Sequence, residues 1–149
     1  MAYIQTKNAN QSIANITATS VQFQTNTNIS WNNTATQLTY ALVGGIYRFT
    51  NSTGYGMTVS ITVNVAWAVN ATGFRMIQVI HSNTTRYGAS PAYSMVPGNA
   101  SIGAVNTLTG TFYMAPTEYF SINAYQNSGG ALNITITNPN TLITITRIS

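Results

Sequence analysis

The sequence contains no cysteine and almost no charge. Five residues are lysine or arginine, Glu118 is the one acidic residue, and aspartate is absent. The lack of cysteine excludes disulfide bonds and thiolate metal sites. General acid–base catalysis often uses paired carboxylates, and a Ser-His-Asp triad needs an aspartate, so neither arrangement can form. With His81 as the single histidine, we expect no enzymatic activity, no catalytic residue, no bound metal and no cofactor.

Positive charge is present but is not concentrated in any one segment. The formal net charge is +4 and the isoelectric point is about 9.6. Nucleic-acid binding requires clustered cations that release several counterions together. The basic residues are instead scattered along the chain, at Lys7, Arg48, Arg75, Arg86 and Arg147. We therefore expect no nucleic-acid partner.

Long apolar runs are also absent. No run approaches the ~20 residues that cross a bilayer, and the first twelve residues, MAYIQTKNANQS, lack the apolar core of a signal peptide. We expect a soluble protein with no membrane insertion, made in a host cytoplasm. An extracellular position would then come from release of an assembled particle.

What the sequence has is alternation of apolar and polar residues. The clearest example is MTVSITVNVAW at 57–67, followed by similar segments at 74–81, 104–114, 118–126, 131–137 and 141–148. Eight to ten short strands joined by Gly, Pro and Asn turns predict an all-β, two-sheet antiparallel sandwich or jelly roll. We expect one jelly-roll domain over residues 21–149, with residues 1–20 as an N-terminal arm that could serve as an anchor.

The alternation also assigns faces. The residues predicted for the core are Val59, Ile61, Val63, Val65, Trp67, Phe120, Ile122 and Ala124. The opposite face of the segment at 118–126 carries Tyr119, Ser121, Asn123 and Tyr125. Tyrosines are unusual in open solvent but common at interfaces, so this row is a candidate trimer interface. The alternative is that these tyrosines cover the sheet of a monomer.

Three stretches resemble one family. WAVNATGFR at 67–75, EYFSINAYQNSGGALN at 118–133 and ITITRI at 143–148 are similar, in this order, to the complement 1q/tumour-necrosis-factor-like jelly roll, closest to its phage, large-virus and bacterial members. The resemblance covers about residues 20–148. It implies a ten-strand, two-sheet jelly roll that assembles as a compact homotrimer, often capping a fibre or stalk. Some members bind calcium, but the absence of aspartate argues against a calcium site in this chain.

These observations favour a virion structural protein. The leading hypothesis is a trimeric capsid-decorating, cap or fibre-head protein on the outer surface of a phage or large DNA virus, held to other virion proteins through the N-terminal arm and aiding host attachment. The alternative is a glycan- or receptor-binding head module of a bacterial or spore-surface filament, with Tyr87, Tyr93 and Tyr113 as sugar contacts. A third hypothesis is a secreted cytokine-like ligand cut from a longer precursor.

Overall fold

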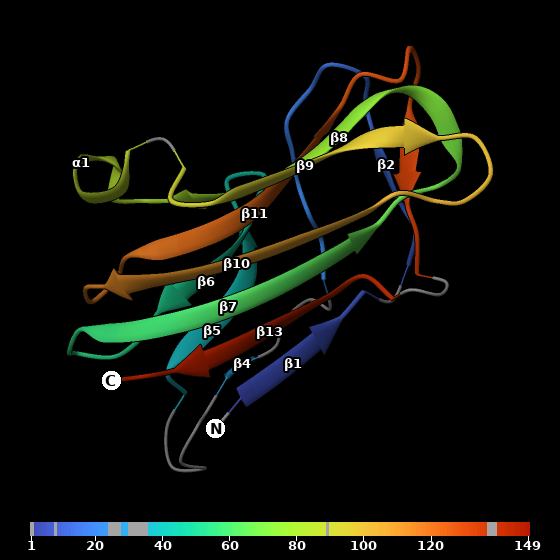
Figure 1. Ribbon diagram of the computed structural model, residues 1–149. Coiled ribbons are helices and arrows are strands. Elements are labelled where there is room, and N and C mark those ends of the chain that lie inside the picture. The colour runs from blue at the N-terminus through green and yellow to red at the C-terminus, as the bar shows by residue number, and fades with distance from the viewer. Residues whose placement is uncertain (1, 8, 24–27, 30–35, 89, 137–139) are drawn as a thin grey trace.

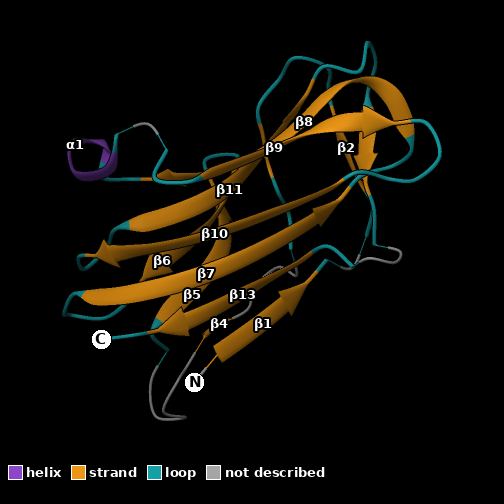
Figure 2. Ribbon diagram, viewed as in Figure 1, coloured by secondary structure: helices purple, strands orange, loops and turns teal. Residues whose placement is uncertain are grey.

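The computed structural model describes residues 2–7, 9–23, 28–29, 36–88, 90–136 and 140–149. In these residues almost all regular structure is β-strand, and one short helix interrupts it (Figure 2). The elements are β1 (Ala2–Thr6), β2 (Gln11–Ile13), β3 (Thr19–Ser20), β4 (Asn28–Ile29), β5 (Leu38–Val43), β6 (Ile46–Asn51), β7 (Met57–Ala66), β8 (Asn70–His81), α1 (Thr84–Tyr87), β9 (Tyr93–Asn99), β10 (Val105–Met114), β11 (Tyr119–Gln126), β12 (Leu132–Ile134) and β13 (Leu142–Arg147).

The strands form two antiparallel sheets packed face to face. One sheet has the order β1-β13-β7-β10, and the other has the order β4-β5-β6-β11-β8-β9, with β3 also pairing with β11. A short third pairing joins β12 to β2. Figure 1 shows the four-stranded sheet lying in front of the second sheet. The prediction of an all-β, two-sheet antiparallel fold is confirmed.

The core lies between the two sheets. On β7 every second residue from Met57 to Val65 is buried, because alternate side chains of a strand point to opposite faces of its sheet. The structure buries all eight residues assigned to the core, with exposed fractions of 2% or less: Val59, Ile61, Val63, Val65, Trp67, Phe120, Ile122 and Ala124.

An aromatic stack connects the sheets. Phe120 on β11 stacks on Phe49 of β6, with ring centroids 4.9 Å apart, and meets Phe112 of β10 edge-to-face at 5.0 Å. Phe49 in turn stacks on Tyr40 of β5 at 4.3 Å. Aromatic pairs in these geometries add about 0.5–1.5 kcal/mol each beyond the area that they bury. The stack therefore fixes the spacing of the two layers at one place in the core.

Strand boundaries differ from the alternation at several points. Residues 70–73, which lie between the alternating segments at 57–67 and 74–81, belong to β8, which pairs with β9 across a register irregularity between Asn70 and Phe74. The stretch between the alternating segments at 74–81 and 104–114 contains α1 and the seven-residue strand β9. The segment at 131–137 pairs only over the three residues of β12. Turn residues inside a strand and short pairings give no period-two signal, which explains these differences.

The N-terminal segment belongs to the sheets. We expected residues 1–20 to form an arm, but β1 pairs with β13 from Ala2↔Thr146 to Thr6↔Leu142, and Ile13 is fully buried. Lys7 is also buried and donates to the carbonyl of Gln22 at 2.7 Å, and burial lowers the pKa of its amine to about 8. Pairing along a sheet edge uses backbone groups. A polar segment can therefore form such a strand without any apolar alternation.

Two of the motif segments meet at one end of the sandwich. Asn127, which follows β11, accepts a hydrogen bond from the amide of Phe74 through Oδ1 at 2.7 Å. The neighbouring Gly73 has φ +68°, and a Cβ added there would overlap the backbone and side chain of Asn127. Gln126 donates through Nε2 to the carbonyl of Ile13 at 3.0 Å and to that of Gly130 at 2.7 Å. The turn at 126–130 therefore holds both the start of β8 and the N-terminal segment.

Replacing Gly73 tests how tightly these segments pack. Gly73→Ala places a side chain in the left-handed region and against Asn127, so we expect it to lower the free energy of unfolding by about 3 kcal/mol. The matched control is Gly44→Ala, because Gly44 has φ +59° but open space around it. We expect the control to lower the free energy by only about 1 kcal/mol. Urea denaturation measures both values, and equal losses would show that the close approach to Asn127 contributes nothing.

Candidate interaction surfaces

The candidate trimer row on β11 lies on the outer face of the larger sheet. Its two tyrosines already have partners in the same chain. The guanidinium of Arg48 lies 4.5 Å from the ring centroid of Tyr119, and the ring of Phe74 stacks on Tyr125 at 5.7 Å. These contacts match the alternative in which the tyrosines cover the sheet of one subunit. The role of this row in a trimer stays a prediction.

The two polar residues of that row are less accessible than alternation suggests. Ser121 is 2% exposed, and Asn123 is half-buried with an Oδ1 that has no hydrogen-bond partner among the described residues. Asn123 pairs with Ser20 of β3 on one side and with Gln78 of β8 on the other. Within this row only Ser121 is fully buried, and the other three residues are half-buried.

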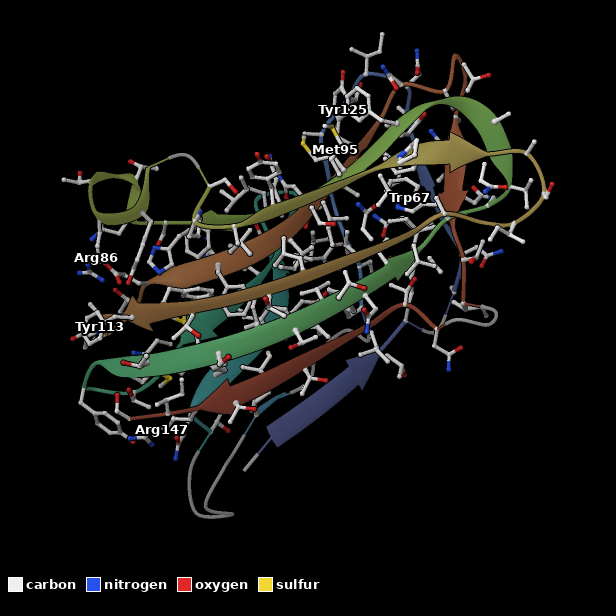
Figure 3. All side chains as sticks on the ribbon, viewed as in Figure 1. Trp67, Arg86, Met95, Tyr113, Tyr125 and Arg147 are labelled. Atoms are coloured by element: carbon white, nitrogen blue, oxygen red, sulfur yellow. The ribbon has the colours of Figure 1, made fainter. Side chains whose placement is uncertain are left out.

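The three tyrosines suggested as sugar contacts do not form one platform. Tyr93 on β9 is 70% exposed and pairs with Gln78, so it stands on the outer face of the larger sheet. Tyr113 on β10 pairs with Thr58 and belongs to the other sheet (Figure 3). Tyr87 is half-buried, packs against His81 at 4.8 Å, and accepts a hydrogen bond from the amide of Tyr113 at 2.7 Å. Only Tyr87 and Tyr113 are brought together.

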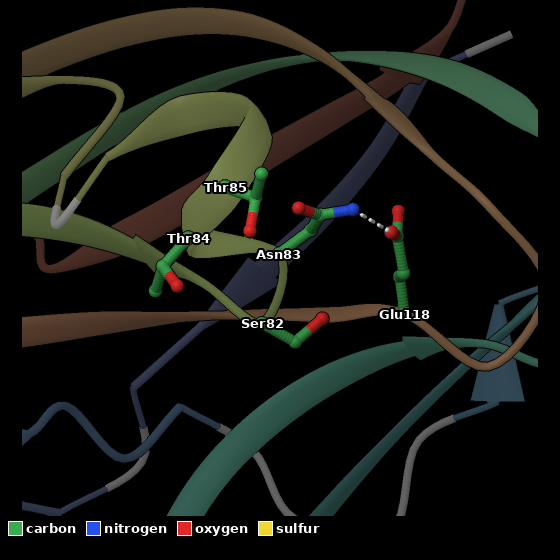
Figure 4. A pocket seen from close by; sticks show the side chains of 5 residues that line it. All are labelled: Ser82, Asn83, Thr84, Thr85 and Glu118. Atoms are coloured by element: carbon green, nitrogen blue, oxygen red, sulfur yellow. Dashed lines mark hydrogen bonds between the residues drawn. The ribbon is translucent and has the colours of Figure 1, made fainter.

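The chain's acidic residue lies in a hollow beside α1. Figure 4 shows this hollow, which is lined by Ser82, Asn83, Thr84, Thr85 and Glu118. The Glu118 carboxylate accepts hydrogen bonds from Asn83 Nδ2 at 2.7 Å, from the amide of Ala115 at 2.7 Å and from Arg86 at 2.9 Å. Burial alone would raise the pKa of Glu118, but these hydrogen bonds and the positive charge of Arg86 outweigh burial and lower that pKa.

His81 lies beneath this hollow but is closed off from it. It is 1% exposed, and its Nδ1 accepts a hydrogen bond from the amide of Asn83 at 3.0 Å. Its Nε2 is 4.0 Å from Glu118 Oε2, which is beyond hydrogen-bond distance. Burial lowers the pKa of His81, and the opposing effect of Glu118 is too small to reverse this shift. A buried, neutral imidazole cannot reach a substrate, so the cluster holds α1 against the turn between β10 and β11.

The cluster predicts loss of stability in weak acid. The folded pKa of His81 is depressed, so the unfolded chain binds more protons below about pH 6.5 and the free energy of unfolding falls as the pH falls. The depressed pKa of Glu118 adds a further loss only below about pH 4.5. His81→Asn keeps an acceptor for the amide of Asn83 but removes the titration. Urea midpoints at pH 7.5, 6.5 and 5.5 should fall for the wild type and stay level for the variant, and a parallel fall in both would exclude His81 as the cause.

The outer face of the four-stranded sheet is covered by small uncharged polar side chains. Across three neighbouring strands of this sheet, Thr62 of β7 lies opposite Thr109 of β10 and Thr144 of β13. None of the described side chains on this face is charged. The small hydroxyl and amide residues of the face are Thr58, Ser60, Thr62, Asn64, Thr107, Thr109, Thr111, Thr144 and Thr146. Tyr113, opposite Thr58, and Leu142, opposite Asn64, lie on the same face. The same period-two alternation that reveals the core could have revealed this face.

The free edge of that sheet is also uncharged. β10 is an edge strand of ten residues, and it carries no lysine, acidic residue or proline. Natural proteins protect exposed edges with such residues or with bulges, because the unpaired backbone groups of an edge can bind another chain. Of the described strands, only β7 pairs with β10. The threonine face and this edge together form a continuous surface whose described strand residues carry no charge.

The comparisons with known proteins show the fold. No family model matches the chain, and no curated protein is similar to it in sequence. Among solved structures, the Eiger TNF of S. frugiperda superposes with a TM-score of 0.64 at 6% identity, covering 100% of this chain and 92% of that one. Murine APRIL at pH 5.0 gives a TM-score of 0.63 at 8% identity, covering 99% of this chain and 98% of that one. The sandwich is therefore a TNF-like jelly roll, which confirms the predicted fold class.

The described residues were also compared with what a metal site and a membrane-spanning helix require. No group of three or more metal-ligating side chains is found in the described part of the chain. The one helix that the structure describes is far too short to cross a bilayer.

Proposed function

We propose that the protein is a non-enzymatic, trimeric jelly-roll subunit on the outer surface of a virus particle. In this proposal it is a capsid-decorating, cap or fibre-head protein of a phage or large DNA virus, with host attachment as a secondary role. The motif resemblance at 67–75, 118–133 and 143–148 supports a particle protein, because it points to the phage and large-virus members of a trimeric family. The TNF-like fold supports the subunit architecture.

The threonine face is the observation that carries the assembly part of the proposal. Burying charged groups at an interface is unfavourable unless each one is paired. Hydroxyl groups both donate and accept hydrogen bonds, so two such faces can satisfy one another in many relative positions. A sheet face without charge, bordered by an edge strand that carries no lysine, acidic residue or proline, is therefore suited to packing against another copy. We place the subunit interface on this face and on residues 105–111 of β10, which leaves Tyr113 at the end of the strand outside the interface.

This placement differs from the row on β11 that the sequence favoured. Tyr119 and Tyr125 are covered by Arg48 and Phe74 of the same chain, so they gain little from a neighbouring subunit. Thr107, Thr109 and Thr111 are exposed in the single subunit and have more surface to bury.

A charge introduced on the face should break the assembly. The purified protein should sediment at roughly 48 kDa, which is three times 16.0 kDa. Thr109→Arg places one unpaired charge in each copy of the interface, and we expect it to raise the trimer dissociation constant by roughly 10²–10³-fold. Sedimentation velocity at micromolar concentration measures this change.

Two further variants separate the possible interfaces. Tyr125→Arg tests the β11 row, and Ala71→Arg, at an exposed position of β8, is the control for added charge. Dissociation by Tyr125→Arg with an intact Thr109→Arg trimer would move the interface to the β11 row. A wild-type monomer at micromolar concentration would contradict the trimer altogether.

The virion role needs a test of its own. Deleting residues 1–18 would test whether the N-terminal segment attaches the protein to a particle, but the deletion also removes β1 and the buried Ile13 from the sheets, so it is unsuitable. The direct test is mass spectrometry of purified particles, with chymotrypsin as the protease because five basic residues give few tryptic peptides. We expect the protein among the structural components, removable by mild denaturant that leaves the shell intact. Its absence from the particles would exclude the virion role and leave the trimer standing.

The second candidate is a glycan- or receptor-binding head of a surface filament. The exposed side chains of Tyr93 and Met95 on β9, 70% and 57% accessible, favour a binding surface on the larger sheet (Figure 3). Screening the intact protein on a glycan array tests this candidate, and silence across a broad array would count against it.

A further inference from the structure

Two arginine–tyrosine pairs lie side by side across one end of the sandwich. The guanidinium of Arg86 lies 4.9 Å from the ring centroid of Tyr113, and that of Arg147 lies 5.2 Å from the ring centroid of Tyr55. The two pairs are linked because the hydroxyl of Tyr113 lies against Gly56, the residue next to Tyr55. Figure 3 shows Arg86, Tyr113 and Arg147 along the same end of the molecule. We call these four residues the arginine–tyrosine row.

The fold assembles the row from four separate segments. Arg86 lies in α1, Tyr113 near the end of β10, and Arg147 at the end of β13. Tyr55 lies in the turn before β7 and is held there by Asn51, whose Nδ2 donates to the carbonyl of Tyr55 at 3.0 Å. Gly56 lacks the side chain that would displace the ring of Tyr113, so the tyrosine can lie across the turn. Contacts between these segments therefore hold the row in place.

The charges of the row are not balanced within the described chain. Arg86 pairs with Glu118, the only acidic residue of the sequence. Arg147 donates through Nη1 to two neutral acceptors, Gln37 Oε1 at 2.7 Å and Tyr55 Oη at 3.3 Å. Of the two guanidinium groups, only that of Arg86 has an acidic partner among the described residues. A guanidinium with only neutral partners is suited to bind the carboxylate of a ligand through paired hydrogen bonds.

The aromatic rings of the row are open to solvent. Tyr55 is 49% exposed and Tyr113 is 41% exposed. An aromatic ring offers a flat apolar surface with a polar hydroxyl at one end, which matches the C–H face and the hydroxyl rim of a sugar ring. The exposed rings of Tyr55 and Tyr113 are suited to a sugar ring, and Arg147, which has no acidic partner among the described residues, is suited to a negative charge. Together they favour a saccharide that carries an anionic group.

We propose that the arginine–tyrosine row binds an anionic glycan. The carboxylate of a uronic or sialic acid residue contacts Arg147, and sugar rings lie on Tyr55 and Tyr113, with Arg86 fixing the second ring. A single-stranded nucleic acid is a poorer fit, because its backbone needs a cationic groove along several phosphates and this row has one cation without an acidic partner. The site lies at the end of the sandwich and does not depend on the proposed trimer or on a virion role.

Titration with defined saccharides tests the proposal. The anionic probes are 3′-sialyllactose and tetragalacturonate, with lactose and maltotetraose as neutral counterparts. Two-dimensional NMR of the wild type should show saturable shifts at Tyr55, Tyr113 and Arg147 with an anionic probe, and at least tenfold weaker binding of its neutral counterpart. This measurement needs no variant, so a folding defect cannot obscure it.

Matched variants test whether Arg147 supplies the positive charge that binds the anionic probe. We expect Arg147→Gln to weaken binding of the anionic probe roughly tenfold or more, which is the effect of removing one charge-assisted hydrogen-bonding group. The control is Arg48→Gln, because Arg48 also lies over a tyrosine, Tyr119, but on the outer face of the larger sheet. The control should bind within twofold of the wild type. Equal weakening by both variants would show a general charge effect and overturn the site.

Other outcomes would also overturn the proposal. No saturable shift with either anionic probe at 10 mM would leave the row as a set of stabilising intramolecular contacts. Tighter binding of oligo-dT than of either saccharide would make it a nucleic-acid site. The Thr109→Arg variant should keep the saccharide binding of a single site, so failure of the trimer proposal is distinguishable from failure of this one.

Discussion

The hydrogen bond between the amide of Phe74 and Oδ1 of Asn127 joins β8 to the turn that follows β11. β8 and β11 are antiparallel, so the turn that follows β11 lies beside the first part of β8 and the two must fit together. The close approach of Gly73 to Asn127 makes this possible, and Gln126 extends the contact to the N-terminal segment through the carbonyl of Ile13. One turn therefore sets the positions of three separate parts of the chain.

That turn exemplifies how a chain with few charges satisfies its buried polar groups. In this chain asparagine and glutamine side chains form the buried polar contacts that ion pairs form in more highly charged proteins. Asn51 donates to the carbonyls of Tyr55, Met114 and Ala115 at the opposite end, and Asn106 accepts the indole N–H of Trp67 at 2.8 Å. Neutral amides avoid the desolvation penalty of buried ions and are insensitive to pH over the physiological range. The few charged groups are then free for specific contacts, such as those of Glu118 and Arg147.

The sequence predicted the sheets better than it predicted the surfaces. Alternation at 57–67 and 118–126 identified the core, because burial of every second side chain leaves a period-two signal. β1 gave no such signal, since an edge strand is held by backbone pairing with β13. The partners of Tyr119 and Tyr125 were also hidden, because Arg48 and Phe74 reach them only after β6, β11 and β8 have paired. The arginine–tyrosine row is similarly a product of topology, drawn from positions between 55 and 147.

The polar side chains at the two ends of the sandwich have different surroundings. At one end, Asn127, Gln126 and the buried Arg75, which donates to the carbonyls of Asn70, Thr72 and Phe74, use their hydrogen-bonding capacity within the chain. At the other end Tyr55 and Tyr113 are exposed and Arg147 meets only neutral acceptors. In a closed ring of three copies, rotational symmetry would bring the same end of every subunit to the same side. Three weak sites on one side bind a surface of repeated ligands far more tightly than one site does, because each bound site raises the local ligand concentration for the others. Assembly through the threonine face and recognition at the arginine–tyrosine row would then reinforce each other while depending on separate residues.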